Sequence, residues 1–528
     1  MEFSDYSSEL QDRKADTMKT PPNKTLLWLS AAAILMFVLL PTRIARAVET
    51  NKSRLIILAD MGNEPDEEQQ MVHMIVCSNE FDLEGLIAVT GKYLRPESRN
   101  PYKQVLHPEL FTGIINAYAR VLNNLKKHAS GWHNPAYLRS IVVEGQKGYG
   151  IADTGPGKAS PGSELITKAV LKNDPRPIWV VVNAGSNTLA QALLDYRKSH
   201  TPAEVDNFVA KLRVFENGAQ DNAGAWICAN FPDIHWIRSN YQTYCYGGPS
   251  GDGGADNKGK QTNLGPYTWK PYAYSGLGQH QWALEHIKAD HGPLGVAWPL
   301  RQFGNGHITF LEGGGTIPWL GLVNKGLFDI EQPHWGGWSG RFSREKVQNY
   351  WSKHSDVKKD EESVAPFAVY KEVADQWTDP DSGERYNDIY TPVWRWRQAF
   401  YNDFVCRMDW CVKPYEQANH HPVAAFNGDK SDTIIHLKTR AGEKLALDAS
   451  ATTDPDGDDF EISWWIYKEA GTYDGDVKIS APRKAKAGIT IPKDAAGKQL
   501  HVILEVKDKS KIASLYDYRR IVIDVTGR

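Results

Sequence analysis

The apolar and polar residues between Arg54 and Trp335 form two kinds of segment in alternation. Continuous apolar runs of strand length are followed by segments with apolar residues three and four positions apart, the spacing of an amphipathic helix. The predicted strands are RLIILAD, LEGLIAVTG, PIWVVVNAG, KLRVFENG and DIHWIRSN; the predicted helices include DEEQQMVHMIVCSNE, HPELFTGIINAYARVLNNLKKH and SNTLAQALLDYRKS. This order predicts an α/β domain with a mostly parallel sheet flanked by helices. We expect Ser186 or Asn187 to cap the third of these helices.

The C-terminal part of the chain has a different pattern. Short alternating runs, from TIIHLKT to RRIVIDVTG, are separated by turn signals such as DPDGDD. This spacing predicts an all-β sandwich of the immunoglobulin type over residues 421–528. Within it, Asp454 and Asp456 are expected to hydrogen-bond their own turn, with a calcium site as the alternative. Residues 343–420 are predicted to be a helical extension and linker that packs on the α/β domain.

The N-terminal segment resembles an export signal. Lys19 and Lys24 precede an apolar run of about 15 residues, and small residues follow at Ala45 and Ala47. A membrane-spanning helix needs roughly 20 apolar residues, so we predict a signal peptide over residues 1–47 rather than an anchor, which is the alternative. The mature protein is then expected in a periplasm or outside the cell, without a stable membrane span.

Composition narrows the possible partners. The formal net charge of the 528-residue chain is −3, and no basic run marks a polyanion site, so nucleic acid is not an expected partner. The chain contains 18 Trp residues, whose rings either fill the core or line a sugar pocket. Export permits disulfides among the five cysteines, but the sequence does not decide their pairing.

A cluster of acidic residues directly follows the first predicted strand: Asp60, Glu64, Asp66, Glu67 and Glu68. Like charges this close repel, so the cluster needs a positive group among them. Ligands of parallel sheets bind at the carboxyl ends of strands, which places Asp60, Thr90 and Asn183 at one edge. Several oxygens there suit Ca²⁺, and a calcium-bound water beside a carboxylate is a nucleophile. The alternative is a solvated acidic loop at the start of a helix.

This stretch resembles the signature of nucleoside hydrolases, in which a strand ends in Asp, and Gly and paired acids then open a helix. The similarity is closer to a branch of exported bacterial nucleoside-hydrolase-like proteins, often labelled cellulose-binding, that have a C-terminal immunoglobulin-like domain. It rests on motifs along nearly the whole mature chain, among them DMGNEPDEEQQ, SNEFDLEGLIAVT, DPRPIWVVVNAGSNTLAQAL, DNAGAWI, WGGWSGRF and ANHHPVAAFNGD. The resemblance implies a nucleoside-hydrolase-like domain over residues 52–342.

The resemblance also implies roles for individual residues. Asp60 is the expected catalytic base and a metal ligand, with Asp66 and Glu67 as further metal or sugar ligands and Ca²⁺ as the cofactor. The residues expected to contact substrate are Glu64, Lys92, Asn183, Asn187 and Glu312. The chain departs from the family pattern at Gly313–Gly315, where an acid that completes the calcium shell is expected. It also has Lys92 near the place of a ribose-contacting Asn, and this ammonium could replace the charge of the metal.

Two functions therefore remain open. The first is an exported hydrolase that cleaves a glycosidic bond in a nucleoside or another sugar, with water deprotonated by Asp60 beside a divalent ion. Its leaving-group acid would be His235 or His280.

The second is non-catalytic binding of a polysaccharide, cellulose or a plant glycan, at a degenerate metal site or on the tail domain. Trp464, Trp465 and Tyr467 are then candidates for stacking on sugar rings. Alternation along a strand places Trp464 and Trp465 on opposite faces, so one is expected in the core and the other outside.

Overall fold

The structure is a computed structural model that describes residues 52–246, 282–300, 313–324, 326–347, 367–380 and 383–527. The predicted signal peptide, Glu312 and His280 lie outside these ranges. Within them, no helix is both long enough and apolar enough to span a membrane.

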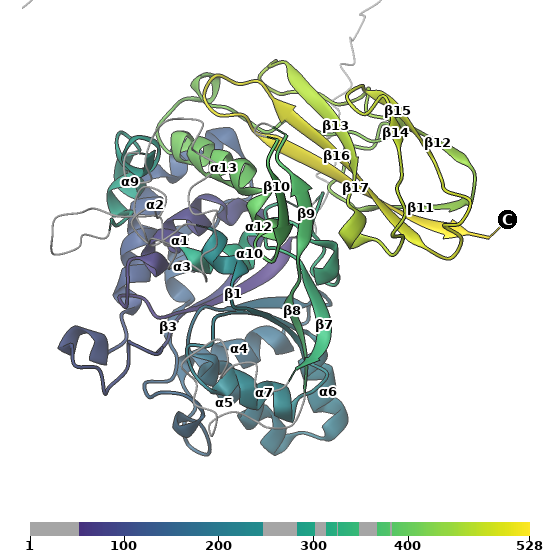
Figure 1. Cartoon of the computed structure of the whole chain (residues 1–528). Coiled ribbons are helices and arrows are strands. Elements are labelled where there is room, and N and C mark those ends of the chain that lie inside the picture. Colours follow the sequence, from purple (N-terminus) through teal and green to yellow (C-terminus); the bar gives the residue numbers. More distant parts are fainter. Residues whose placement is uncertain are drawn as a thin grey trace, which may run out of the picture. The chain divides into compact units, whose positions relative to one another are not determined.

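The first large element is an eight-stranded sheet (Figure 1). Its strands, in spatial order, are β3 (Val142–Glu144), β2 (Phe81–Ala88), β1 (Ser53–Ala59), β4 (Ile178–Val182), β5 (Leu212–Asn217), β6 (His235–Ser239), β8 (Phe367–Glu372) and β7 (Phe342–Val347). Every neighbouring pair is parallel except β7 and β8, which are antiparallel. The predicted mostly parallel α/β fold is thus confirmed. From β1, the chain adds β2 and β3 on one side of the sheet and then β4, β5 and β6 on the other side. Sheets of this kind bind ligands between the two strands where the side changes, here β1 and β4, beyond their carboxyl ends.

Both faces of the sheet are covered by helices. Side chains of β1 alternate between the two faces, since Leu55 and Ile57 belong to one hydrophobic cluster and Ile56 and Leu58 to the other. Helices α1 (Asp66–Val76), α2 (Pro108–His128), α10 (Ile317–Leu320) and α13 (Arg397–Trp410) contribute to the first cluster. Helices α4 (Pro161–Leu171), α5 (Ser186–Ser199), α6 (Pro202–Ala210) and α7 (Ala223–Asn230) contribute to the second, and Figure 1 shows them below the sheet. Two shorter helices are α3 (Pro135–Ser140) and α9 (Gly292–Ala297).

The start of α5 differs from the prediction. Its N-cap is Gly185, in the left-handed conformation with φ 62°, and not Ser186 or Asn187. A side chain distant in the sequence supplies the missing acceptor. Asp221 accepts hydrogen bonds from the Ser186 hydroxyl and, at 3.1 Å, from the backbone N–H of Asn187. The predicted cap was wrong because a tertiary contact, rather than a local one, satisfies the first turn of this helix.

The segment that follows residue 342, predicted to be helical, contains strands as well as helices. Strands β7 and β8 extend the main sheet, β9 (Asp375–Thr378) and β10 (Arg385–Asp388) form a hairpin, and α12 (Thr391–Trp394) precedes α13. The helical part of the predicted extension is therefore present as α12 and α13. Strand β7 buries only its terminal residues, Phe342 and Val347. The charged residues between them concealed its strand character in the sequence.

The C-terminal region is a sandwich of two sheets, as predicted (Figure 1). The four-stranded sheet has the order β11 (Ile435–Arg440), β17 (Tyr516–Thr526), β16 (Gln499–Asp508), β13 (Phe460–Ile466). The three-stranded sheet has the order β12 (Lys444–Asp448), β15 (Lys486–Thr490), β14 (Ile479–Ser480). Trp464 is buried in the cluster between them, whereas its neighbour Trp465 is half-buried on the other face, which confirms the predicted alternation. Tyr467 is fully buried and so does not serve as an exposed stacking surface.

Two smaller predictions concern local chemistry. Asp454 accepts hydrogen bonds from the backbone N–H groups of Asp456 and Asp458, which is the predicted self-contained turn. Asp456 instead accepts from His420. All five cysteines are free and buried, so none of the possible disulfides is formed.

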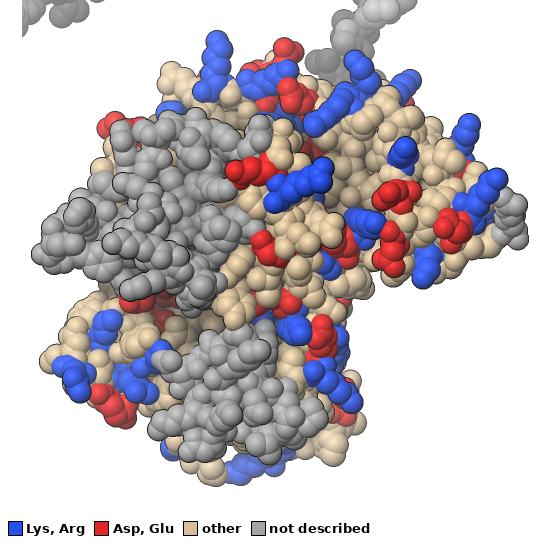
Figure 2. All heavy atoms as spheres, in the orientation of Figure 1, with Lys and Arg blue, Asp and Glu red and all other residues tan. Residues whose placement is uncertain are grey.

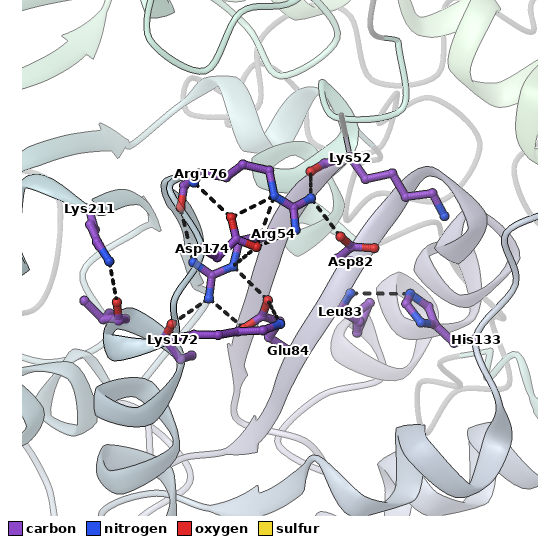
Figure 3. Close-up of polar contacts among 12 residues, drawn as sticks. Lys52, Arg54, Asp82, Leu83, Glu84, His133, Lys172, Asp174, Arg176 and Lys211 are labelled. Atoms are coloured by element: carbon purple, nitrogen blue, oxygen red, sulfur yellow. Dashed lines mark hydrogen bonds and ion pairs between the residues drawn. The ribbon is translucent and has the colours of Figure 1, made fainter. Parts of the chain in front are cut away.

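A network of paired charges lies at the amino end of β1 (Figure 3). Arg54 is fully buried and binds both carboxylate oxygens of Glu84, at 2.7 and 2.8 Å. Lys172 also contacts Glu84 at 3.0 Å, and Arg176 bridges Asp174 and Asp82. These contacts hold the pKa of the Glu84 carboxyl below its ordinary value, against the effect of burial. The network joins β1, β2 and the segment before β4 and compensates its own charges.

Candidate functional site

A tight turn at the carboxyl end of β1 brings the acidic residues together. The Asn63 N–H donates to the Asp60 carbonyl at 3.0 Å, and Gly62 has φ +87°, which L side chains rarely adopt. A Cβ at Gly62 would also lie 2.9 Å from the His107 ring. Helix α1 then begins at Asp66, so Asp66, Glu67 and Glu68 form its first turn, as predicted. The helix dipole partly offsets their negative charge there.

Asp60 is buried without full compensation. Its side chain is 3% exposed, and Oδ2 has no hydrogen-bond partner among the residues that the structure describes. A Cβ on Gly91 would lie 2.5 Å from this oxygen, so the glycine allows the backbone after β2 to approach the carboxyl group. Burial, and then the charges of Asp66 and Glu64, raise the pKa of Asp60 to about 8. Without a bound cation, this carboxyl is therefore largely protonated at neutral pH.

Glu67 and Asn183 connect α1 to the end of β4. Asn183 Nδ2 donates to Glu67 Oε2 at 3.1 Å and to the Gly315 carbonyl at 3.4 Å, while Asn183 Oδ1 has no partner in the described parts of the chain. Burial, followed by the charges of Asp66 and Asp60, raises the pKa of Glu67 well above its ordinary value. A Cβ at Gly315 would lie 2.3 Å from Asn183 Nδ2. The glycine stretch therefore packs its backbone against Asn183, where the family pattern suggested an acidic side chain.

Glu68 extends the set of protonatable carboxyls. Burial is the main cause that raises its pKa to about 7, and the Asp66 charge adds to this. Its Oε2 is buried and has no partner within the described residues. Asp60, Glu67 and Glu68 thus share one property, which is a neutral form favoured by burial and by repulsion from the Asp66 charge.

The remaining predicted residues have varied surroundings. The Lys92 N–H donates to Gln220 at 3.3 Å, and its ammonium lies 4.5 Å from the centre of the Tyr93 ring. Asn187 Nδ2 donates to the carbonyls of Gly148 and Gly150, so it holds the loop after β3 rather than presenting its donors to a ligand. Thr90 donates to the same Gly148 carbonyl, at 2.8 Å.

One expectation about proton donors is wrong. His235 is the first residue of β6, so it lies at the amino edge of a parallel sheet, opposite the edge that holds Asp60. It is also half-buried, and the partial loss of solvent lowers its pKa to about 3 and keeps the ring neutral. His235 is therefore not the leaving-group acid. His280 lies outside the described residues.

Sequence reasoning missed Asp221. This residue is 1% exposed and sits shortly after β5, where it binds the start of α5. Three hydrogen-bond donors stabilise its carboxylate: the Ser186 hydroxyl and the backbone N–H groups of Asn187 and Ala223. Its place in the DNAGAWI motif, after a strand, was the only available signal. Because its oxygens are occupied, Asp221 orients the start of α5 and does not repeat the chemistry of Asp60.

The oxygen ligands at the end of β1 suit a hard cation. Glu67 contacts the Asn183 amide, and Asp60 follows the neighbouring strand β1. Asp60 Oδ2 and Asn183 Oδ1 both lack a partner within the described ranges. Ca²⁺ prefers such oxygens at about 2.3–2.6 Å. In the described parts of the chain, the sole trio with ligand atoms all within 4.8 Å is elsewhere, at His73, Cys77 and Asp403. Asp60, Asp66 and Glu67 therefore do not bring three ligand atoms within that distance of one another.

The trio at His73 is better explained as core. Asp403 already binds Arg407 at 2.8 Å and His421 at 2.7 Å, and His73 Nδ1 contacts the Tyr246 hydroxyl at 2.8 Å. The His73 ring stacks on Phe404 with centroids 3.9 Å apart. Asp403 and His73 Nδ1 are engaged in these contacts, whereas His73 Nε2 is buried without a partner among the described residues, so the trio is best described as a buried polar network.

Comparison with known proteins identifies two matching family models. One, described as "Cellulose-binding Sde182, nucleoside hydrolase-like domain", matches residues 54–342. The other, "Cellulose-binding protein Sde0182, C-terminal domain", matches residues 444–525. No curated protein matches the chain.

A solved structure is similar over most of the chain. It is a nucleoside hydrolase-related hypothetical protein from Saccharophagus degradans that is associated with carbohydrate metabolism. The two sequences are 35% identical, the TM-score is 0.71, and the match covers 90% of this chain and 100% of the other.

Proposed function

Because the chain belongs to the family of Sde182-type cellulose-binding proteins with a nucleoside hydrolase-like domain, we propose that it is an exported, carbohydrate-active protein. We further propose that the edge formed by the ends of β1 and β4 hydrolyses a glycosidic bond of a nucleoside or another sugar. The observation that carries this proposal is the Asp60 carboxyl, whose Oδ2 has no partner among the described residues. Burial, and after it the charges of its acidic neighbours, raises the pKa of this carboxyl to about 8. Perturbed carboxyls of this kind gather at functional sites.

The proposed chemistry assigns a task to each residue. Asp60, Glu67 and Asn183 would hold a divalent ion, which, when bound, supplies positive charge and lowers the pKa of water. With such a charge beside it, Asp60 would be an ionised carboxylate able to accept a proton from water. The sugar gains positive charge as the glycosidic bond breaks, and the surrounding carboxylates stabilise that state more than the neutral substrate. Asp66 and Glu64 add to this negative field.

The test is hydrolysis by the purified chain with calcium present. Release of reducing sugar is measured on nucleosides and on small oligosaccharides. Asp60→Asn should lower turnover at least a few hundredfold while the fold, followed by circular dichroism, remains intact. Asp206→Asn, on the exposed face of α6, is the matched control and should keep full activity. Full activity of Asp60→Asn would contradict the mechanism.

The alternative function is polysaccharide binding without turnover. It is favoured by Gly315, whose backbone, rather than an acidic side chain, packs against Asn183, and by the cellulose-binding description of the family. If the wild-type chain hydrolyses none of these substrates with calcium and still binds cellulose, this alternative replaces the hydrolase.

A further inference from the structure

A cleft with aromatic walls lies between the β9–β10 hairpin, α12 and the four-stranded sheet of the C-terminal region. Its volume is about 370 Å³. The aromatic rings that line it are Trp377, Trp394, Trp396, Trp465, Tyr516 and Tyr518. A second cavity of about 540 Å³ shares several lining residues with the first, including Gln398, Ser463 and Glu505, and continues along β13 and β16. Both volumes fall within the range of ligand pockets, roughly 300–1,000 Å³.

The two more accessible rings are held in place by their neighbours. Trp377 and Trp465 are half-buried, whereas Trp394 and Trp396 are 5% and 2% exposed. Trp377 stacks on Tyr386 with centroids 5.8 Å apart. The Arg395 guanidinium lies 4.6 Å from the centre of the Trp465 ring. A ligand that meets these rings does not have to order them, which lowers the entropy cost of binding.

The cleft is not the result of poor packing between the parts of the chain that meet beside it. Asp375 is buried next to it and binds Arg341 at 2.6 Å and the Tyr467 hydroxyl at 2.6 Å. Arg520 is fully buried and donates to the Leu327 and Gly336 carbonyls at 2.7 and 3.0 Å. The adjoining contact is thus closed by several buried hydrogen bonds, while the aromatic cleft stays open.

The polar groups of the cleft suit a neutral ligand with many hydroxyls. Two carboxylates, Asp379 and Glu505, are balanced by two guanidinium groups, Arg395 and Arg483, and Gln398 adds an amide. On the face shown in Figure 2, basic and acidic side chains are likewise interspersed. Polyanions require an excess of positive charge, which this lining does not offer. Flat aromatic rings beside planar hydrogen-bonding groups match the apolar faces and the hydroxyl edges of sugar rings.

We propose that this cleft binds a segment of a neutral polysaccharide chain of the cellulose type, with Trp377 and Trp465 as its stacking surfaces. Together with the second cavity, which shares several of its lining residues, the cleft offers space for more than one linked sugar ring. The choice of glucan follows the cellulose-binding description of the family. The cleft is separate from the acidic edge at β1 and goes beyond the proposed hydrolysis, because binding here needs neither Asp60 nor a cation.

The test measures retention of the purified chain on microcrystalline cellulose and its affinity for cellohexaose by calorimetry. Trp377→Ala and Trp465→Ala should each weaken binding at least tenfold, whereas Trp377→Tyr, which keeps a flat ring, should stay within about threefold of wild type. Trp226→Ala is the matched control, because Trp226 is also half-buried but lies on α7. Circular dichroism and thermal melting verify that each variant is folded.

The outcomes separate this proposal from the hydrolase. Wild-type binding by folded Trp377→Ala and Trp465→Ala, or no wild-type binding to either glucan, overturns the cleft proposal. Asp60→Asn should bind cellulose normally and lose only hydrolysis. Absence of hydrolysis by a wild-type chain that binds cellulose through Trp377 would overturn the proposed hydrolase and leave the cleft proposal standing.

Discussion

The two ends of β1 both hold buried charges, but they balance at one end and accumulate at the other. At the amino end, Arg54 binds Glu84 through two hydrogen bonds, and the pKa of Glu84 falls below its ordinary value (Figure 3). At the carboxyl end, Asp60 and Glu67 lie among other acids, and their pKa values rise. The strand between the two ends is fully apolar.

The difference separates a charge cluster that is satisfied within the fold from the one to which we assign the proposed function. A buried ion pair with its hydrogen bonds satisfied leaves nothing for a ligand to supply. Buried carboxyls with unpartnered oxygens raise the energy of the folded chain until a cation, a proton or a positively charged transition state arrives. In this protein, the second situation occurs where the strand order reverses, which is the usual ligand position in such sheets.

The largest expected effect is a loss of folding stability when one partner of the ion pairs at the amino end of β1 is removed. Arg54→Met leaves Glu84 buried with only Lys172 as a cationic partner, so we expect a loss of about 3–5 kcal/mol in the free energy of unfolding. Urea denaturation measures it. The double variant Arg54→Met/Glu84→Leu should recover much of that loss, because no uncompensated charge remains. A loss below about 1 kcal/mol in the single variant would show that the network contributes little.

Calcium bound at the carboxyl end of β1 should raise the stability of the folded chain. At a free concentration 100 times its dissociation constant, a ligand specific for the folded state adds about 2.7 kcal/mol to the free energy of unfolding. We expect such a gain for the wild-type chain and for Asp206→Asn, and its absence in Asp60→Asn. Thermal melts with calcium and with a chelator provide the measurement. Equal gains in Asp60→Asn and wild type would place the ion elsewhere.

Per pH unit, the smallest effect is the difference in pH dependence between the two ends. Asp60 has a pKa of about 8 in the folded chain, against 3.8 for its ordinary value, so the folded state binds more protons between these limits. Its contribution therefore makes the cation-free chain less stable as pH rises from about 4 to 8, by about 1 kcal/mol per pH unit or less. Glu84, whose pKa is lowered, has the opposite sign: its stabilisation is lost as pH falls below its ordinary value of 4.5.

Denaturation of wild type and Asp60→Asn across this range, with a chelator present, checks the assignment. The variant should have a flatter profile between pH 5 and 8 than the wild type. If the stability profiles of wild type and Asp60→Asn run parallel across this pH range, Asp60 is not the group that binds the extra proton in the folded state.

The acidic site was predictable in outline because its residues are adjacent in the chain. A strand, a glycine turn and three acids that open a helix specify their own geometry, so Asp60, Asp66 and Glu67 could be placed from local patterns. The contacts between residues far apart in the sequence could not be predicted from local patterns. The packing of Gly315 on Asn183 joins positions far apart in the chain, as does the cap that Asp221 provides for α5.

The sequence by itself determined the alternation of strands and helices, the change to a β-sandwich and the position of the acidic turn. These features follow from periodicity and from backbone rules that act over a few residues. Only the tertiary structure decided which carboxyls lose their solvent, which oxygens are left without partners, and that Trp377 and Trp465 line one cleft. Burial and electrostatic environment depend on the whole surroundings of a side chain, and those are assembled from segments that the linear order keeps apart.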